Sequence, residues 1–161
     1  MYVVIGTAIN LLLTSLGAYV LSRKNLFWKN VLTVLIIFTM FFSGGLIPKY
    51  LTVMKLGLID SRWAVILPSA ISTYNMIIMR TSFLSIPDSL EESATIDGAS
   101  DVRILFSIIL PLSLPVVAVM ILFYGVSHWN SWFNAMVYLR SRELYPLQLI
   151  LREILITNSI D

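Results

Sequence analysis

The sequence contains no cysteine and few charged residues. Of its 161 residues, 12% are charged and 58% are hydrophobic, whereas about a quarter of the residues in an average soluble domain are charged. The absence of cysteine excludes disulfides, thiol catalysis and cysteine-ligated metals. The shortage of charge excludes the usual water-facing surface of a soluble enzyme, and the abundance of apolar residues excludes a disordered chain.

Two patterns that would indicate nucleotide or nucleic-acid binding are also missing. The chain has no GxxxxGK[ST] loop, so it does not bind ATP in that way. Its eleven basic residues are scattered and the net charge is only +2, which leaves no basic stripe for nucleic acid. We therefore expect no cofactor, no metal, no catalytic residue and no nucleic-acid partner, and we expect lipid to be the solvent.

Long uncharged runs are what the sequence does have. They predict an all-α, polytopic membrane protein in one domain over residues 1–161, because each run is about long enough to cross roughly 30 Å of hydrocarbon as a helix. A signal peptide is disfavoured for the first run, since no basic residue precedes it and Arg23 and Lys24 follow it. The predicted spans cover residues of about 2–22, 31–47, 63–80 and 108–128.

The distribution of basic residues leaves the orientation of these spans open. Lysine and arginine are shared almost equally between the linkers on the two sides, so the positive-inside rule does not decide. The tryptophans lie near the ends of the runs, where interfacial anchors are expected. They are Trp28, Trp63, Trp129 and Trp132.

The linker of about residues 86–106 is acidic and has the local pattern of two short helices. Pro87 suits a first helical turn, and Ser89 and Glu92 have the spacing of a capping box. Gly98 can adopt a positive φ and end the first helix. An apolar stripe at four-residue spacing would give this helix a buried face; its members are Ile86, Leu90 and Ala94.

The same linker resembles the EAA motif of ABC importer permeases, which reads E-A-A, three residues, G, nine residues, then I-x-L-P. Here it reads Glu92-Ser93-Ala94, Gly98 and Ile108-x-Leu110-Pro111, with Ser93 as the single departure. The flanking segments resemble the MalG-like carbohydrate permeases, especially the LplC/YtcP-type subgroup. These segments are SGGLIPKYLTVMKLGLIDS, LPSAISTYNMIIMRTSF, FYGVSHWNSWF and LYPLQLILREIL.

This resemblance implies a MetI-like helical bundle that works in a larger assembly. In that family two permease subunits form the pathway, and each EAA loop, called the coupling helix, docks into a groove on a cytoplasmic ATPase. The implied partners are ABC ATPase subunits, a second permease subunit, an extracytoplasmic sugar-binding lipoprotein and the lipid bilayer. The implied function is ATP-driven import of a carbohydrate, expected to be an oligosaccharide, by alternating access; the permease itself is not an enzyme.

The resemblance also implies a place for the chain. It would be a multi-pass protein of the bacterial plasma (inner) membrane, with the EAA loop in the cytoplasm and both ends of this chain outside. Members of the family usually have six spans. We therefore expect this chain to lack the first and the last of them.

The candidate coupling residues are Leu90, Glu92, Ser93, Ala94, Asp97 and Gly98. Glu92 would cap the helix, or contact a basic residue of the ATPase in a charge-assisted hydrogen bond. Asp97 would be a turn residue or a partner contact. Leu90 and Ile96 would pack on the membrane part or enter the ATPase groove. Catalysis by Glu91 and Glu92 is disfavoured, because adjacent helical residues do not face one another.

A second group of candidates would line a substrate pathway, since amides and aromatic rings bind sugars. It consists of Asn75, Trp129, Asn130 and Trp132. Hydrogen bonding between helices is the other interpretation of the asparagines. For His128 we expect an interfacial or interhelical hydrogen bond rather than a hydrolase site with Ser127 and Ser131.

Two other functions remain open on the residues alone. An ion-coupled secondary transporter or channel usually carries ionisable residues within its spans, and these runs contain none apart from His128 near one end. An intramembrane hydrolase would need a Ser–His or paired-Asp arrangement at membrane depth. The acids of this chain all lie in linkers.

Overall fold

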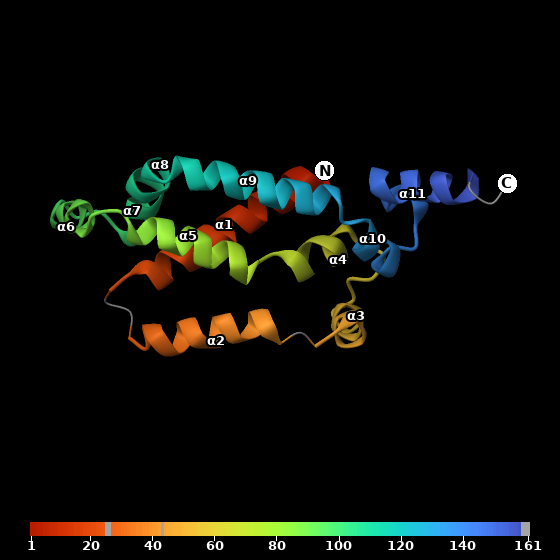
Figure 1. Ribbon diagram of the computed structural model, residues 1–161, viewed down its shortest axis with the longest axis horizontal. Coiled ribbons are helices and arrows are strands. Elements are labelled where there is room, and N and C mark those ends of the chain that lie inside the picture. Colours follow the sequence, from red (N-terminus) through yellow and green to blue (C-terminus); the bar gives the residue numbers. More distant parts are fainter. Residues whose placement is uncertain (25–26, 43, 159–161) are drawn as a thin grey trace. The chain divides into compact units, whose positions relative to one another are not determined.

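The computed structural model describes residues 1–24, 27–42 and 44–158, and this part of the chain is helical and contains no strand. The predicted all-α class is confirmed. The described residues group into two compact units, and the single domain expected from the sequence stays a prediction. The first unit comprises residues 1–10, 44–70 and 123–158, and the second comprises residues 11–24, 27–42 and 71–122. The order of the helices can be followed in Figure 1.

The first unit packs short helices around small buried side chains. Within it, α10 packs against both α4 and α11. Its cores contain Val65, Ala135, Leu139 and Leu149 in one cluster, and Val53, Ala64 and Tyr138 in another. Its elements are the start of α1 (Tyr2–Ser22), α3 (Leu46–Lys55), α4 (Arg62–Ile66), the 3-10 turn η1 (Leu67–Ser69), the end of α9 (Leu114–Trp129), α10 (Trp132–Tyr138), the 3-10 turn η3 (Arg142–Leu144) and α11 (Leu147–Asn158).

A buried polar network joins three elements of the first unit. The Nδ2 of Asn10, on α1, donates to the carbonyl of Ser69 over 2.6 Å, and its Oδ1 lies 3.0 Å from Nε2 of His128 on α9. Asn10 is 1% exposed and His128 4%. Buried polar groups are stable only when they are hydrogen-bonded, so each side chain fixes the other. The interhelical hydrogen bond expected for His128 is confirmed.

A second set of hydrogen bonds in the first unit centres on Asp60. This residue has a positive φ of 60°, and its N–H donates to the carbonyl of Tyr138. Its carboxylate accepts the N–H groups of Arg140 and Ser141 at 2.8 Å each, and the hydroxyl of Ser141. These donors hold the pKa of Asp60 below its usual value. Asp60 therefore ties the loop before α4 to the loop after α10.

The second unit contains the acidic linker. Within it, α2 packs against α5, and buried Met79 and Phe83 of α5 belong to its interior. The Nε of Arg80 donates to the carbonyl of Leu21 over 2.9 Å, so this arginine satisfies the end of α1. Its elements are the rest of α1, α2 (Lys29–Phe41), α5 (Thr73–Leu84), α6 (Asp88–Ile96), α7 (Asp101–Ile104), the π-helical turn η2 (Leu105–Ile109), α8 (Leu110–Leu112) and the start of α9.

The helices of the structure do not correspond one to one with the four predicted spans. Among the described residues, α1 alone is long and apolar enough to cross a membrane unaided, and up to three spans result if each of two bent helix pairs is one span. Residues 63–80 are not one helix: η1 ends at Ser69 and α5 begins at Thr73, where the Ser72 side chain caps the N–H of Asn75. The fourth run bends at Ser113, between two prolines. Which helices cross stays a prediction.

The two faces of α1 have the polarity that lipid requires. Five apolar side chains on it are exposed, and five polar ones are buried, the reverse of a helix in water. Each buried polar group avoids hydrocarbon by lying against protein. The exposed apolar residues are Val4, Ala8, Leu12, Leu16 and Val20, and the buried polar ones are Thr7, Asn10, Thr14, Ser15 and Ser22.

We predict that Gly6→Ala destabilises the first unit. A Cβ at this position would lie 2.5 Å from Nε2 of His128. The His128 ring cannot move away without breaking its hydrogen bond with Asn10. Overpacking of this kind costs about 1–3 kcal/mol. Gly125→Ala is the matched control, because its Cβ meets only Thr7 at 4.0 Å. Thermal unfolding in detergent should show a lower midpoint for the first variant alone; equal midpoints would contradict the packing.

A second prediction concerns the pH dependence of the Asp60 contacts. Because the folded pKa of Asp60 is lowered, its carboxylate stabilises the fold above the ordinary carboxyl pKa of about 4, and this contribution is lost as the pH falls through the lowered value. Asp60→Asn should therefore unfold at a lower temperature than the unsubstituted protein at neutral pH, and the difference should shrink below about pH 4. Glu143→Gln, with the same charge change, should leave the midpoint at neutral pH unchanged.

Candidate functional site

The acidic helix α6 begins at Asp88, with Pro87 as its N-cap. The capping box expected between Ser89 and Glu92 is wrong, because Ser89 already lies inside the helix and its carbonyl accepts the hydroxyl of Ser93 over 2.8 Å. Pro87 precedes the first turn rather than forming part of it. Two acids in that first turn, Asp88 and Glu91, interact favourably with the helix dipole.

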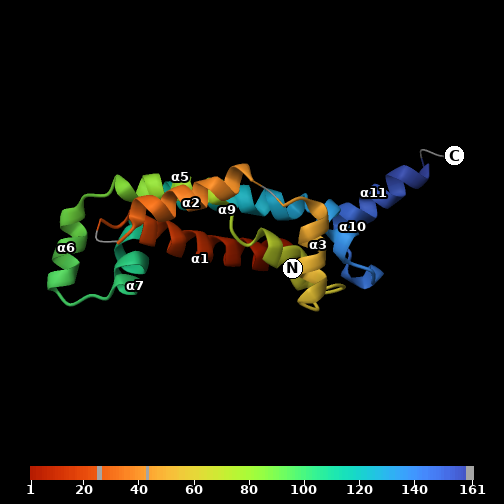
Figure 2. The ribbon, with the colours of Figure 1, turned by 90° about the horizontal axis from the view of Figure 1, so that it is seen from below.

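The turn that ends α6 is the one the sequence predicts. Gly98 has a φ of +78°, and its N–H donates to the carbonyl of Thr95. The N–H of Ala99 donates to the carbonyl of Ala94 over 2.9 Å. These paired bonds form a Schellman motif, in which a left-handed residue satisfies the last carbonyls of a helix. Gly98 therefore ends α6, and Figure 2 shows the turn that leads from α6 to α7.

Several apolar side chains of this loop are exposed rather than packed. Ile96 is 86% exposed, Val102 61% and Leu90 42%, whereas Ala94 is buried at 9%. Of the two interpretations of Ile96, packing against the rest of the described chain is therefore wrong. Ser93 and Asp97 are also exposed. Leu90 and Ile96 lie on α6 and Val102 on α7, and exposed apolar residues on neighbouring elements are typical of a contact surface.

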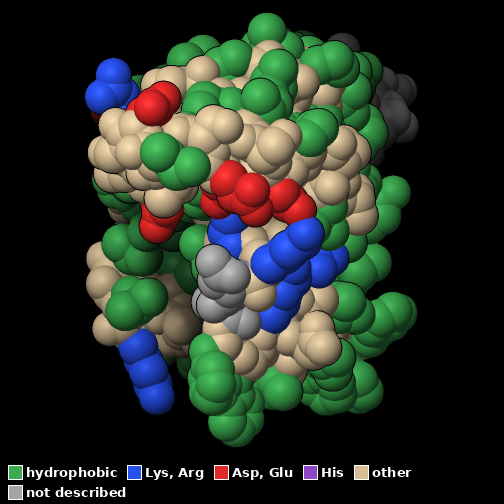
Figure 3. Space-filling view, turned by 90° about the vertical axis from the view of Figure 1, so that its left-hand side faces the viewer, with side chains coloured by type: hydrophobic (Ala, Val, Ile, Leu, Met, Phe, Trp, Pro, Cys, Tyr) green, Lys and Arg blue, Asp and Glu red, His purple; other side chains and the backbone are tan. Residues whose placement is uncertain are grey.

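Glu92 is exposed and forms no hydrogen bond or ion pair with the described residues. Its interpretation as a helix cap finds no support, since no side chain caps the N-terminus of α6. Figure 3 shows acidic side chains beside basic ones on this face of the molecule. Within this group the carboxylate of Glu92 is left available.

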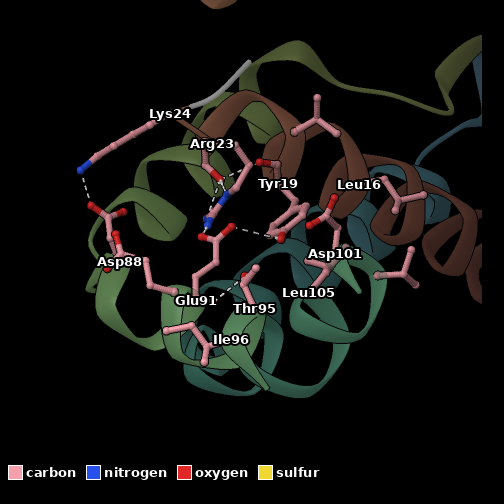
Figure 4. A pocket seen from close by; sticks show the side chains of 14 residues that line it. Leu16, Tyr19, Arg23, Lys24, Asp88, Glu91, Thr95, Ile96, Asp101 and Leu105 are labelled. Carbon is pink, nitrogen blue, oxygen red and sulfur yellow. Dashed lines mark hydrogen bonds and ion pairs between the residues drawn. The ribbon is translucent and has the colours of Figure 1, made fainter. Parts of the chain in front are cut away.

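A cavity of about 830 Å³ lies between the end of α1 and the acidic loop, within the second unit. Apolar side chains of α1 and η2, among them Leu16 and Leu105, form part of its wall. The charged lining comes from the two residues that follow α1 and from α6 and α7, most of it labelled in Figure 4. It consists of Arg23, Lys24, Asp88, Glu91, Glu92 and Asp101.

Two ion pairs cross this cavity, and the sequence analysis predicted neither. Arg23 pairs with Glu91, and Lys24 pairs with Asp88. The second pair raises the pKa of Lys24 and lowers the pKa of Asp88, in each case chiefly through their mutual hydrogen bond. The sequence shows two basic residues directly after the first apolar run. It does not show which acids they pair with, because these acids lie more than sixty residues away.

The residues proposed for a substrate pathway lie in two places. Trp129 is 49% exposed at the end of α9, and the exposed Asn130 follows it. Trp132 is half-buried, and the guanidinium of Arg152 lies 4.2 Å from its ring centroid. Asn75 belongs to the second unit and is buried at 8%. Trp129, Asn130 and Trp132 therefore belong to the first unit, within four consecutive residues.

The described residues contain no group of histidine, aspartate and glutamate that could hold a metal. Residues 12–132 match the family described as binding-protein-dependent transport system inner membrane component. The chain belongs to this family. Proteins of this family are inner membrane components of binding-protein-dependent transport systems.

Relatives in Bacillus subtilis confirm the resemblance found from the EAA motif. The chain is 52% identical to the polygalacturonan/rhamnogalacturonan transport system permease protein YtcP, over 97% of this chain and 54% of that protein. It is 46% identical to the protein LplC, over 98% of this chain and 53% of that protein. The chain therefore spans about half the length of the relatives it matches.

A solved structure confirms the fold. The crystal structure of a bacterial ABC transporter involved in the import of the acidic polysaccharide alginate matches with a TM-score of 0.91 and 40% identity. The match covers 94% of this chain and 54% of that one. The helices therefore have the MetI-like permease arrangement.

We predict that the turn after α6 depends on the backbone conformation of Gly98 and not on space. Nothing lies within 4 Å of a Cβ built there, so Gly98→Val should cost only the left-handed conformation, about 1–2 kcal/mol. Gly98→Asn should cost less, because asparagine tolerates this conformation. Hydrogen exchange of the Ala99 amide should be faster in the valine variant than in the asparagine variant. Equal rates in both would contradict the prediction.

Proposed function

We propose that this chain is the membrane-spanning permease part of an ATP-driven ABC importer for carbohydrate, and that α6 with its glycine turn is the coupling helix. It would sit in the bacterial plasma membrane as a multi-pass protein, with α6 in the cytoplasm. Its partners would be ABC ATPase subunits, a second permease subunit and an extracytoplasmic sugar-binding lipoprotein. ATP hydrolysis would take place on the ATPase subunits.

The observation that carries this proposal is the surface of α6 and the turn after it. Exposed Leu90 and Ile96 on α6 and exposed Val102 on α7 are accompanied by Glu92, an exposed carboxylate that forms no ion pair with the described residues. Contact surfaces often combine an apolar centre with a few charged groups that fix the orientation. A groove with apolar walls and a basic residue would complement this surface. Ser93, Ala94, Asp97 and Gly98 would shape and support it.

The choice of carbohydrate as cargo rests on the relatives and on the aromatic residues. One relative is named for polygalacturonan and rhamnogalacturonan transport, and the solved structure belongs to an alginate importer. Trp129 and Asn130 offer an exposed ring and an amide, which suit a sugar ring and its hydroxyls. We propose that they line the pathway with Trp132 and Asn75, and that the cargo is an oligosaccharide.

The structure suggests how α6 would transmit a movement. Pro87 and Gly98 bound the helix on either side, so a push on it reaches the neighbouring helices as a displacement of a short rigid body. ATPase closure would push α6 and switch the pathway between inward-open and outward-open states. Alternating access requires two global arrangements that a partner biases.

We predict that Glu92→Lys disrupts the contact with the ATPase in the assembled transporter. The substitution places a cation where a basic partner is expected, so the amount of ATPase that co-purifies should fall about tenfold, a loss of ~1.4 kcal/mol, and sugar uptake should fall with it. Glu143→Lys, an equal charge change at another exposed acid, should leave both unchanged. Unaltered ATPase binding, or uptake that follows a proton gradient and ignores ATP depletion, would overturn the proposed function.

A further inference from the structure

The two ion pairs that join α1 to α6 differ in their surroundings. The side chains of Arg23 and Glu91 are 19% and 22% exposed, whereas those of Lys24 and Asp88 are 75% and 50% exposed. An exposed pair contributes little, because water and salt screen it. A pair shielded from water is screened less, and removing one partner leaves a charge that solvent cannot fully stabilise.

The guanidinium of Arg23 is held on several sides. Its Nε and Nη2 donate to the hydroxyl of Ser22 at 3.1 and 3.0 Å, and it lies 4.5 Å from the ring centroid of Tyr19. The Tyr19 hydroxyl donates to Oε1 of Glu91 over 3.5 Å, while Arg23 pairs with Oε2. Glu91 is thus held by two side chains of the α1 end (Figure 4). We name Tyr19, Arg23 and Glu91 the α1–α6 clamp.

The clamp fixes α6 to the end of α1, which matters because α6 is too short to be stable by itself. The helix has nine residues, a length at which a helix is marginal by itself, and a turn lies at each end. Ala94 is its buried residue, and the burial of one methyl group is a small anchor. Without the clamp, a push on α6 would be absorbed by rotation about its turns.

The neighbouring acids Glu91 and Glu92 of α6 have different surroundings and therefore different proposed roles. Consecutive residues of a helix project in different directions. Glu91 points toward α1, while the neighbouring Glu92 stays exposed. The carboxylate that would meet the ATPase is therefore distinct from the one that holds the helix.

We propose that the α1–α6 clamp makes α1 move with the coupling helix, and that Arg23 and Glu91 are positioning residues for energy coupling. This inference rests on the proposed function. A displacement of α6 reaches Arg23 through the ion pair and then α1, which continues unbroken from Tyr2 to Ser22. The clamp leaves the surface for the ATPase untouched.

The test is the uptake of sugar per ATP hydrolysed in the assembled transporter. Glu91→Gln keeps the size of the side chain and its bond to Tyr19 but removes the charge. ATPase co-purification should remain, while uptake per ATP falls at least about fivefold, the lower range of coupling between sites. Arg23→Gln should do the same. The double variant Arg23→Glu with Glu91→Arg should recover most of the loss, because it restores the ion pair in reverse.

The exposed pair supplies the matched control. Lys24→Gln, directly after Arg23, and Asp88→Asn, on the same helix as Glu91, remove charges of the same sign and should leave uptake per ATP unchanged. The clamp is overturned if Glu91→Gln retains full coupling, if the exposed pair matters equally, or if the charge swap recovers nothing. Loss of ATPase binding in Glu91→Gln would also overturn it, because Glu91 would then belong to the ATPase contact.

A second measurement tests the clamp without any partner. In the isolated protein in detergent, Glu91→Gln should speed hydrogen exchange of α6 amides at least about fivefold, whereas Asp88→Asn should not. Unchanged exchange would overturn the clamp. Failure of the proposed function is recognised separately, since Glu92→Lys would then leave ATPase binding intact while these exchange rates still differ.

Discussion

The constraint on which this structure depends is that backbone groups in hydrocarbon must find their hydrogen bonds within the protein. The long uncharged runs are helical because a helix satisfies its own N–H and C=O groups. Where a helix is interrupted, side chains or other backbone groups form hydrogen bonds with the N–H and C=O groups that the helix leaves unpaired. Ser72 caps the start of α5, the carbonyl of Ser69 accepts Asn10, and Arg80 satisfies the carbonyl of Leu21.

Hydrocarbon also disfavours charged side chains, so the acids lie in the linkers, where water or partners can reach them. The acidic linker shows the result: its acids stabilise the first turn of a helix, pair with the basic residues after α1, or remain exposed. A short charged helix at the end of apolar helices is suited to receive a push from a water-soluble partner, because it can be contacted without exposing the apolar helices. The family assignment and the position of this helix both support the proposal that α6 is the coupling helix.

The elements that the sequence predicts well are those fixed by local physics. The bounds of α1 follow from an uncharged run with basic residues after it, and the turn after α6 follows from Gly98, whose positive φ other residues avoid. The capping box failed because two start sites one or two residues apart differ little in local energy. The Asp60 contacts and the pairing of Arg23 with Glu91 depend on neighbours distant in the sequence, which no local pattern contains.

Glu91 and Glu92 show why spacing alone does not assign roles within a motif. On the sequence, either acid could be the one that meets a partner, and the resemblance to the EAA motif points to Glu92. The structure adds a reason: Glu91 is already held by Arg23 and Tyr19, so its release would leave the guanidinium without its anion. Glu92 forms no ion pair with the described residues. A new contact at Glu92 would therefore break no ion pair of the described chain, which supports the proposal that Glu92 contacts the ATPase.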